Sequence, residues 1–190
     1  MNGFQRRREK KMEDILEAAF TLFSANGIKT VSIAEIAKRA NVSQVSIYNF
    51  FESKENLARQ AYFKMMDEKM KDLEMLIKSN LSFQEKFEKL VFISLETANN
   101  LSEDFYQSEF AKDPTVLKFL EEYGHKKTLP LLMDLIEQGK RESCIDSGIS
   151  SESILIYIHS INGVLQSNIS KKVRMDLGKL FFYGLFGKKG

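Results

Sequence analysis

Apolar residues recur along most of this chain at intervals of three and four positions, the spacing of helices that bury one face. From residue 13 this spacing predicts a helix that ends near Asn26, where Asn26-Gly27 supplies a left-handed stop. No segment alternates apolar and polar residues between hairpin turns, and only 2 Pro and 10 Gly interrupt the pattern. The sequence therefore predicts an all-α fold.

Two short helices are predicted next, each with its own start signal. Ser32 and Glu35 have the spacing of a capping box, so a helix is expected over about residues 33–40. Ser43 is the N-cap expected for a following helix over about residues 44–50. Apolar residues flank both caps in the arrangement of hydrophobic staples: Val31 with Ile36, and Val42 with Ile47. The segment is interpreted as a helix-turn-helix.

Longer helices are predicted over the rest of the chain. Ser53 is the expected cap of a connector helix that continues to about Ser79. Asp113-Pro114 combines an N-cap with Pro at the first helical position, and opens a long segment that Pro130 should kink. Other helices are expected from Ser82 onward and over residues 102–112, 152–167 and 173–186.

The composition indicates a folded chain in a reducing compartment. Hydrophobic residues make up 43% of the 190 residues, with 15 Phe and 8 Met, which is enough to bury a core. The single cysteine, Cys144, excludes an internal disulfide framework, and no Cys/His spacing suggests a metal site. No apolar run approaches the ~20 residues needed to span a bilayer. We expect a cytoplasmic protein without a membrane partner or a cofactor.

Charge is unevenly placed although the net charge is only +2. Residues 1–60 hold 10 Lys/Arg against 7 Asp/Glu, and the remainder holds 18 against 19. The basic excess begins with Arg6, Arg7, Arg8, Lys10 and Lys11. Such a segment is either a solvated end or a nucleic-acid arm, so charge alone does not decide the function.

The second helix of the predicted helix-turn-helix has side chains suited to DNA. The major groove admits one α-helix whose first turn protrudes, and Ile47 is expected to anchor this helix to the protein. Gln44 can pair with an adenine edge and Val45 can contact a thymine methyl, whereas the others suit phosphates. The candidate DNA-binding residues are Thr30, Ser43, Gln44, Val45, Tyr48, Asn49 and Lys54.

The segment TVSIAEIAKRANVSQVSIYNFFESKENL, residues 30–57, resembles the amino-terminal signature of the TetR family of bacterial transcriptional regulators. The resemblance covers about residues 10–60 and implies that the candidate residues above occupy DNA-contacting positions. Departures are few: Asn41 replaces the usual turn Gly, Asn49 replaces a frequent His, and Glu52 stands where Pro or Gly is common. The resemblance further implies a DNA-binding domain over residues 1–53 and an effector-binding and dimerisation domain over residues 54–190.

The resemblance also implies a homodimer formed through the last two helices. Two apolar stripes agree with this arrangement: Ile154, Ile158, Ile161 and Leu165, and then Leu177, Leu180, Phe181 and Leu185. A two-fold dimer spaces two recognition helices about one turn of DNA apart, which predicts a pseudo-palindromic operator. The alternative is that both stripes belong to the core of one chain.

An effector cavity is expected among the middle helices, where Phe, Met and Tyr are dense. The candidate wall residues are Met66, Met70, Phe87, Phe105, Phe110, Phe119, Tyr123 and Tyr157. The alternative for each residue is ordinary core, because any helical bundle requires apolar residues at helical spacing. A ligand of this cavity would be a small apolar or amphipathic molecule that shifts the population between two spacings of the recognition helices.

Other classes of function fit the sequence less well. The two histidines, His125 and His159, and Cys144 have no catalytic or metal-ligand spacing, so we expect no enzymatic activity. The nearest alternative is an architectural or non-inducible DNA-binding protein with the same helix-turn-helix and no effector pocket. A helical scaffold that binds only proteins is the third reading.

Overall fold

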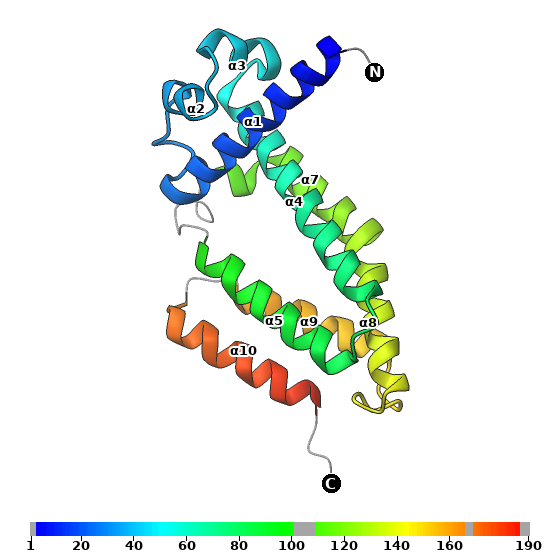
Figure 1. Ribbon diagram of the computed structural model, residues 1–190. Helices are drawn as coiled ribbons and strands as arrows, with labels where there is room; N and C mark the ends of the chain where they lie inside the picture. Colours follow the sequence, from blue (N-terminus) through cyan, green and yellow to red (C-terminus); the bar gives the residue numbers. More distant parts are fainter. Residues whose placement is uncertain (1–2, 101–108, 166–168, 187–190) are drawn as a thin grey trace. The chain divides into compact units, whose positions relative to one another are not determined.

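The computed structural model describes residues 3–100, 109–165 and 169–186, and all regular structure in these ranges is helical (Figure 1). The all-α prediction is confirmed. The amino-terminal helices are α1 (Gly3–Asn26), α2 (Ile33–Arg39), α3 (Gln44–Phe51) and α4 (Lys54–Lys78). They are followed by α5 (Phe83–Asn100), the 3-10 turn η1 (Glu109–Lys112), α7 (Pro114–Tyr123), the π turn η2 (Gly124–Thr128), α8 (Leu129–Arg141), α9 (Ser151–Leu165) and α10 (Lys171–Phe186).

The chain divides into two compact units, and neither is continuous in sequence. The first unit comprises Met1–Lys69 and Asn100–Leu120, and the second comprises Met70–Asn99 and Glu121–Gly190. The predicted domain boundary between residues 53 and 54 stays a prediction, because packing groups the helix-turn-helix with a longer part of the chain. None of the described helices combines the length and apolar character needed to cross a bilayer.

The first unit is built around α1, whose apolar face meets α2, α3 and the start of α4. The fully or nearly fully buried side chains are Ile15, Ala18, Ala19, Phe23, Val31, Ile33, Ile36, Ala37, Ile47, Phe51, Leu57, Ala58 and Ala61. Residues from the second segment complete this unit. Arg59 of α4 pairs with Asp113 at 2.8 Å, and the rings of Phe63 and Phe119 stack with centroids 4.0 Å apart.

The second unit has its own core, formed by α5, α8, α9 and the end of α4. Its buried side chains are Ile77, Phe83, Phe87, Leu131, Leu135, Ile136, Ile145 and Ile154. Gly139 marks the closest approach within it, since a Cβ there would lie 2.9 Å from the Phe83 ring and 2.8 Å from Ile145 Cδ1. Only glycine fits at this position without a shift of its neighbours.

A buried lysine joins three elements of the second unit. Lys86 of α5 is 3% exposed, and its ammonium donates to Ile77 O at 2.6 Å and to Gln138 Oε1 at 2.7 Å. Gln138 Nε2 in turn donates to Leu81 O at 3.0 Å. The charge thereby satisfies a carbonyl at the end of α4, which has no partner within its own helix. The network fixes the turn between α4 and α5 against α8.

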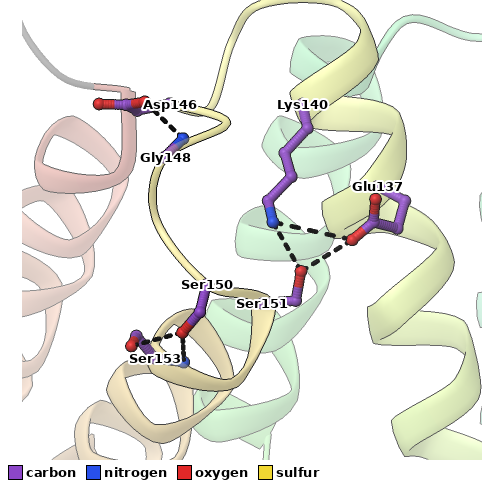
Figure 2. A network of polar contacts seen from close by, with 7 residues as sticks. All are labelled: Glu137, Lys140, Asp146, Gly148, Ser150, Ser151 and Ser153. Carbon is purple, nitrogen blue, oxygen red and sulfur yellow. Dashed lines mark hydrogen bonds and ion pairs between the residues drawn. The ribbon is translucent and has the colours of Figure 1, made fainter.

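Polar side chains also join α8 to α9 (Figure 2). Lys140 Nζ donates to Ser151 Oγ at 2.8 Å, and that hydroxyl donates to Glu137 Oε1 at 2.7 Å. Ser150 caps α9, because its Oγ accepts the backbone N–H of Ser153 at 3.1 Å. The start of α9 is therefore held both by its own cap and by the preceding helix.

Two helix boundaries differ from the prediction. The first helix begins at Gly3 instead of near residue 13, because the charged residues ahead of Glu13 are good helix formers and no proline interrupts them. The segment before Pro130 is interrupted by η2, where Leu129 N–H donates to Gly124 O, five residues earlier. This π turn lies directly before the proline, which has no N–H to donate to the helix.

Candidate nucleic-acid interface

The start of α2 is fixed by the predicted capping box. Ser32 Oγ accepts the N–H of Glu35 at 3.2 Å, and Glu35 Oε2 accepts the N–H of Ser32 at 2.7 Å. Hydrogen bonds from the backbone and hydroxyl of Ser32 lower the pKa of the Glu35 carboxyl, so the cap is charged near neutral pH. The prediction of this cap from two residues is confirmed.

The turn between α2 and α3 closes as a Schellman motif without glycine. Asn41 has φ 51°, the left-handed conformation that was expected for it. The N–H of Val42 reaches back to Ala37 O at 3.0 Å, and that of Asn41 to Lys38 O at 3.4 Å. Ser43 then caps α3 by accepting the N–H of Ser46 at 3.1 Å. These bonds set the direction in which α3 leaves the turn.

One face of α3 is anchored and the other is exposed. Ile47 is 1% exposed and lies in the core of the first unit, as predicted. Val45 is 66% exposed and Tyr48 is 49% exposed, and Gln44 and Asn49 are exposed with them. The four proposed reading side chains of α3 therefore share its outward side. Whether they contact DNA stays a prediction.

The remaining candidates flank α3 and are bonded within the protein. Thr30 Oγ1 donates to Gly27 O at 3.0 Å and also to Asn26 O, which closes the end of α1. Lys54 Nζ donates to Lys29 O at 3.3 Å from the first turn of α4. A phosphate at either residue would have to replace or share these bonds.

The end of α3 has a feature that the sequence did not predict. Glu52 has φ 64° and ψ −43°, and its N–H donates to Tyr48 O at 2.8 Å. A residue with a β-carbon in this sparsely populated backbone region costs about 1–3 kcal/mol, whereas Gly adopts positive φ without that penalty. One feature of the sequence indicates this conformation, namely that Glu52 stands where Pro or Gly is common in the family it resembles.

The proposed effector-pocket residues are distributed over both units. Met66, Phe110 and Phe119 belong to the first unit, and Met70, Phe87, Tyr123 and Tyr157 belong to the second. Phe105 lies outside the described residues. Several of these rings pack against other rings. Phe119 stacks on Phe63, and the centroid of Phe110 lies 5.6 Å from that of Tyr62. The centroids of Phe87 and Tyr157 lie 5.8 and 5.4 Å, respectively, from that of Phe181.

None of the proposed pocket residues lines either of two surface hollows in the part of the chain that the structure describes. The larger, about 660 Å³, lies in the second unit and has a mixed lining, with Ile77 and Leu81 beside Lys86, Gln138 and Glu142. The smaller, about 430 Å³, lies beside the start of α3. The effector pocket therefore stays a prediction, and within the described residues no group of His, Cys, Asp and Glu is arranged to hold a metal ion.

The apolar stripe predicted on α9 for a dimer faces its own chain instead. Ile154 is 4% exposed, and Ile158 packs against the same core. On α10, Phe181 lies between the rings of Phe87 and Tyr157. The structure therefore favours the alternative of an intrachain core for these residues. The side chains of Leu165 and Leu185 lie outside the described part of the chain.

Six large apolar residues on the last two helices are exposed, and one of them, Leu180, belongs to the predicted stripes. These residues are Ile156, Tyr157 and Val164 of α9 and Val173, Met175 and Leu180 of α10. Ile156 is 62% exposed and Leu180 is 65% exposed. The prediction that one chain leaves apolar surface on these helices agrees with the structure at Leu180. On α9 the exposed residues differ from the predicted ones, because both faces of that helix are apolar.

The fold and the exposed α3 define a helical protein with an amino-terminal helix-turn-helix of the kind found in transcriptional regulators. Residues 15–61 match the family model described as bacterial regulatory proteins, tetR family. The amino-terminal part of this chain is therefore similar to the TetR family, in the segment whose sequence resembles that family.

Other similarities extend beyond this domain. The chain is 33% identical over 82 residues to the uncharacterized HTH-type transcriptional regulator YhgD of Bacillus subtilis, across 43% of each chain. A transcriptional regulator from Cytophaga hutchinsonii has the same fold, with a TM-score of 0.74, 18% identity and coverage of 93% of this chain and 99% of that one. The regulator FadR from Bacillus subtilis, solved with stearoyl-CoA, has a TM-score of 0.60 at 17% identity, over 90% and 98%. The chain spans less than half the length of the first curated relatives it matches.

Proposed function

We propose that this protein is a sequence-specific DNA-binding transcriptional regulator. The observation that carries the proposal is the exposed face of α3, held in place by the buried Ile47 within a TetR-family domain. A helix anchored on one side and exposed on the other is what the major groove of B-DNA accepts. The protein acts in the bacterial cytoplasm, where its target DNA lies, and it is not an enzyme.

The side chains of α3 divide between reading bases and holding the backbone. Gln44 is at the first turn of α3, where its amide can donate and accept at an adenine edge. Val45 presents a methyl surface of the kind that contacts thymine. Tyr48 and Asn49, further along the helix, suit phosphate oxygens. Lys54, Ser43 and Thr30 flank these positions and complete the proposed contact set.

The protein acts as a homodimer through α9 and α10 in this proposal. The exposed apolar residues of the two helices support it, because six large apolar side chains exposed on two helices of one unit are characteristic of an interaction surface. A second copy of the chain covers this surface by two-fold symmetry. The dimer then presents two α3 helices to a pseudo-palindromic operator.

The regulator is a repressor that a small apolar or amphipathic molecule releases from the operator. Repression requires only that the bound dimer occludes a promoter, without contact to the polymerase. The solved relative with stearoyl-CoA supports an amphipathic ligand of the acyl-CoA kind. Release follows if the ligand binds one spacing of the recognition helices more tightly than the other.

Selection of binding sites from random duplexes, followed by affinity measurements at fixed salt, tests the DNA-binding proposal. Gln44→Ala should change the preferred base at one position, with discrimination reduced by about 1–3 kcal/mol. Tyr48→Ala should weaken binding to all duplexes alike, because phosphates carry no sequence information. Gln84→Ala on α5 is the matched control and should change neither. Absence of salt-dependent binding to any duplex contradicts the proposal.

Titration of the operator complex with long-chain acyl-CoA tests the effector part separately. The expected result is a decrease in operator affinity of about 5–150-fold, the usual range of allosteric coupling. Unchanged affinity across acyl-CoA and free fatty acids of several lengths contradicts this part and leaves a non-inducible DNA-binding protein.

A further inference from the structure

The amino-terminal turns of α1 place cations beside α3. These residues form a continuous part of the helix from Gly3, so their side chains have fixed directions. Lys11 and Arg8 lie four and seven positions before the buried Ile15, and therefore on the same face of α1. That face packs on the helix-turn-helix further along the chain. The face of α1 that is apolar from Ile15 onward therefore carries positive charges, Arg8 and Lys11, in the preceding turns.

Two contacts confirm that this charged stripe reaches the helix-turn-helix. The guanidinium of Arg8 lies 5.5 Å from the centre of the Phe50 ring, in the last turn of α3. Lys11 lines the hollow of about 430 Å³ beside the first turn of α3. Figure 1 shows the start of α1 near α3 in the same unit. The early start of α1, which the sequence pattern missed, therefore has a structural consequence at the recognition helix.

The hollow has the chemistry of an anion site. It is lined by Lys11 of α1, Lys38 of α2, the Asn41–Val42 turn, Ala37, and the hydroxyl-bearing Ser43 and Ser46. No Asp or Glu is among its lining residues. Within the described residues, neither ammonium has a hydrogen bond or ion pair to another side chain. Two cations from different helices thus meet at one polar surface without a protein counter-charge.

The position of the hollow indicates which anion it holds. Ser43 belongs both to the hollow and to the proposed contact set, so the hollow is continuous with the surface of α3 that faces DNA. Backbone phosphates repeat along both strands next to any helix in the major groove. We infer that Lys11 and Lys38 form a seat for a DNA backbone phosphate beside α3, an inference that rests on the proposed function.

This seat adds affinity without sequence preference. Each phosphate that the lysines neutralise releases counterions, which steepens the fall of binding with salt by about 0.9 in the logarithmic slope. The proposed homodimer has one such site in each protomer and so neutralises two phosphates, which account for about 1.8 of that slope. The corresponding loss of affinity on removing both lysines is roughly 60-fold near 0.1 M salt and vanishes toward 1 M.

The test compares Lys11→Ala/Lys38→Ala with the wild type on the selected operator over a range of KCl concentrations. The expected result is a slope reduced by about 1.8, with the base preference unchanged. Lys71→Ala/Lys89→Ala, which removes two exposed lysines from α4 and α5, is the charge-matched control and should retain the wild-type slope. Lys11→Arg/Lys38→Arg should also retain it, because both cations remain. Circular dichroism establishes that each variant folds.

Three results overturn the inference. The first is an unchanged slope in Lys11→Ala/Lys38→Ala, and the second is an equal reduction in the control pair. The third concerns inorganic phosphate alone: the wild type binds it with a Kd below about 1 mM, the alanine variant does not, and the operator slope of that variant is unchanged. This result assigns the hollow to a small anion instead of DNA. Wild-type protein that binds no duplex at all is a failure of the proposed function, and is distinguishable from these results.

Discussion

The two compact units differ in how far each buries its own apolar residues. In the first unit, α1 to α3 and the start of α4 enclose a core in which Ile15, Phe51 and Leu57 have no exposed surface. The apolar residues that α3 leaves exposed, Val45 and Tyr48, are on its proposed DNA-binding face. In the second unit, α9 and α10 leave a row of large apolar side chains exposed. The difference supports the proposal that a second copy of the chain covers the exposed apolar surface of the second unit.

The units also differ in the range of the interactions that define them. The caps of α2 and α3 join residues three positions apart, such as Ser32 with Glu35. The second unit depends on bonds between distant segments, such as Lys86 with Gln138, 52 positions apart. Local bonds form wherever the sequence supports them, whereas the distant ones form only when the whole unit packs. The second unit should therefore be the more sensitive to changes in packing and assembly.

The largest expected effect concerns the surface of α9 and α10. Ile156→Asp/Leu180→Asp places two charges on the proposed dimer surface, and should raise the dimer Kd by at least roughly a thousandfold, or about 4 kcal/mol. Sedimentation velocity over a concentration series measures this. Met75→Asp/Phe92→Asp changes two equally exposed residues, 65% and 68%, on α4 and α5, and should leave the dimer intact. Equal effects of the two pairs would contradict the assignment of the interface.

The next effect is on the core of the first unit. Phe51→Ala removes a ring that is completely buried, and should lower the free energy of unfolding by about 3–5 kcal/mol. Tyr48→Ala on the same helix removes a ring that is 49% exposed, and should cost less than about 1 kcal/mol. Urea unfolding followed by circular dichroism compares the two. Similar losses would mean that α3 is not anchored on one face only.

A smaller effect is expected from Gly139→Ala in the second unit. Its new Cβ would lie 2.9 Å from the Phe83 ring, and the displacement should cost about 1–3 kcal/mol. Gly124→Ala is the matched control, since nothing lies within 4 Å of a Cβ there, and it should be neutral or stabilising by up to about 1 kcal/mol. Thermal unfolding of both variants measures the difference. A stable Gly139→Ala would show that α8 and α5 are further apart than described.

The smallest expected effect is on the pH dependence of stability. The hydrogen bonds that Gln138 and the Phe83 N–H donate to Glu142, with the positive charge of Lys86, lower the pKa of this carboxyl from 4.5. Its folded pKa is below its unfolded pKa, so its contribution is complete above about pH 4.5 and is lost as the pH falls through the folded value. Glu142→Gln should therefore reduce the dependence of the free energy of unfolding on pH in the acid range, the acid limb of the stability curve. Glu121→Gln, an exposed carboxyl of the same unit, should leave that limb unchanged.

The helix-turn-helix was predictable because short-range rules specify it. Ser32 with Glu35, Asn41 at a turn and Ser43 as a cap each act over a few residues, and all three are present in the structure. The outward direction of Gln44 and Tyr48 follows once Ile47 is assigned to the core. The sequence pattern thus specified the candidate interface down to the side of the helix that carries it.

The features that the sequence did not reveal depend on distant residues. Lys86 reads as a surface lysine until α8 supplies Gln138 as its partner. On α9, Ile154 and Ile156 belong to different faces, and only packing decides which of them is buried. The charged start of α1 lacks apolar residues at helical spacing, so the sequence pattern predicted neither its helical structure nor its position beside α3. Periodicity identifies a helix but not the neighbour it will meet.

The discontinuity of the first unit limits how such proteins recombine. Three residues from the second segment of that unit contact α4. Phe110 contacts Tyr62, Asp113 pairs with Arg59, and Phe119 stacks on Phe63. A gene fusion made at one junction after residue 69 would leave these α4 side chains without their partners. Grafting this helix-turn-helix together with α4 onto another helical domain therefore requires two crossovers, or a host whose own residues fit against α4.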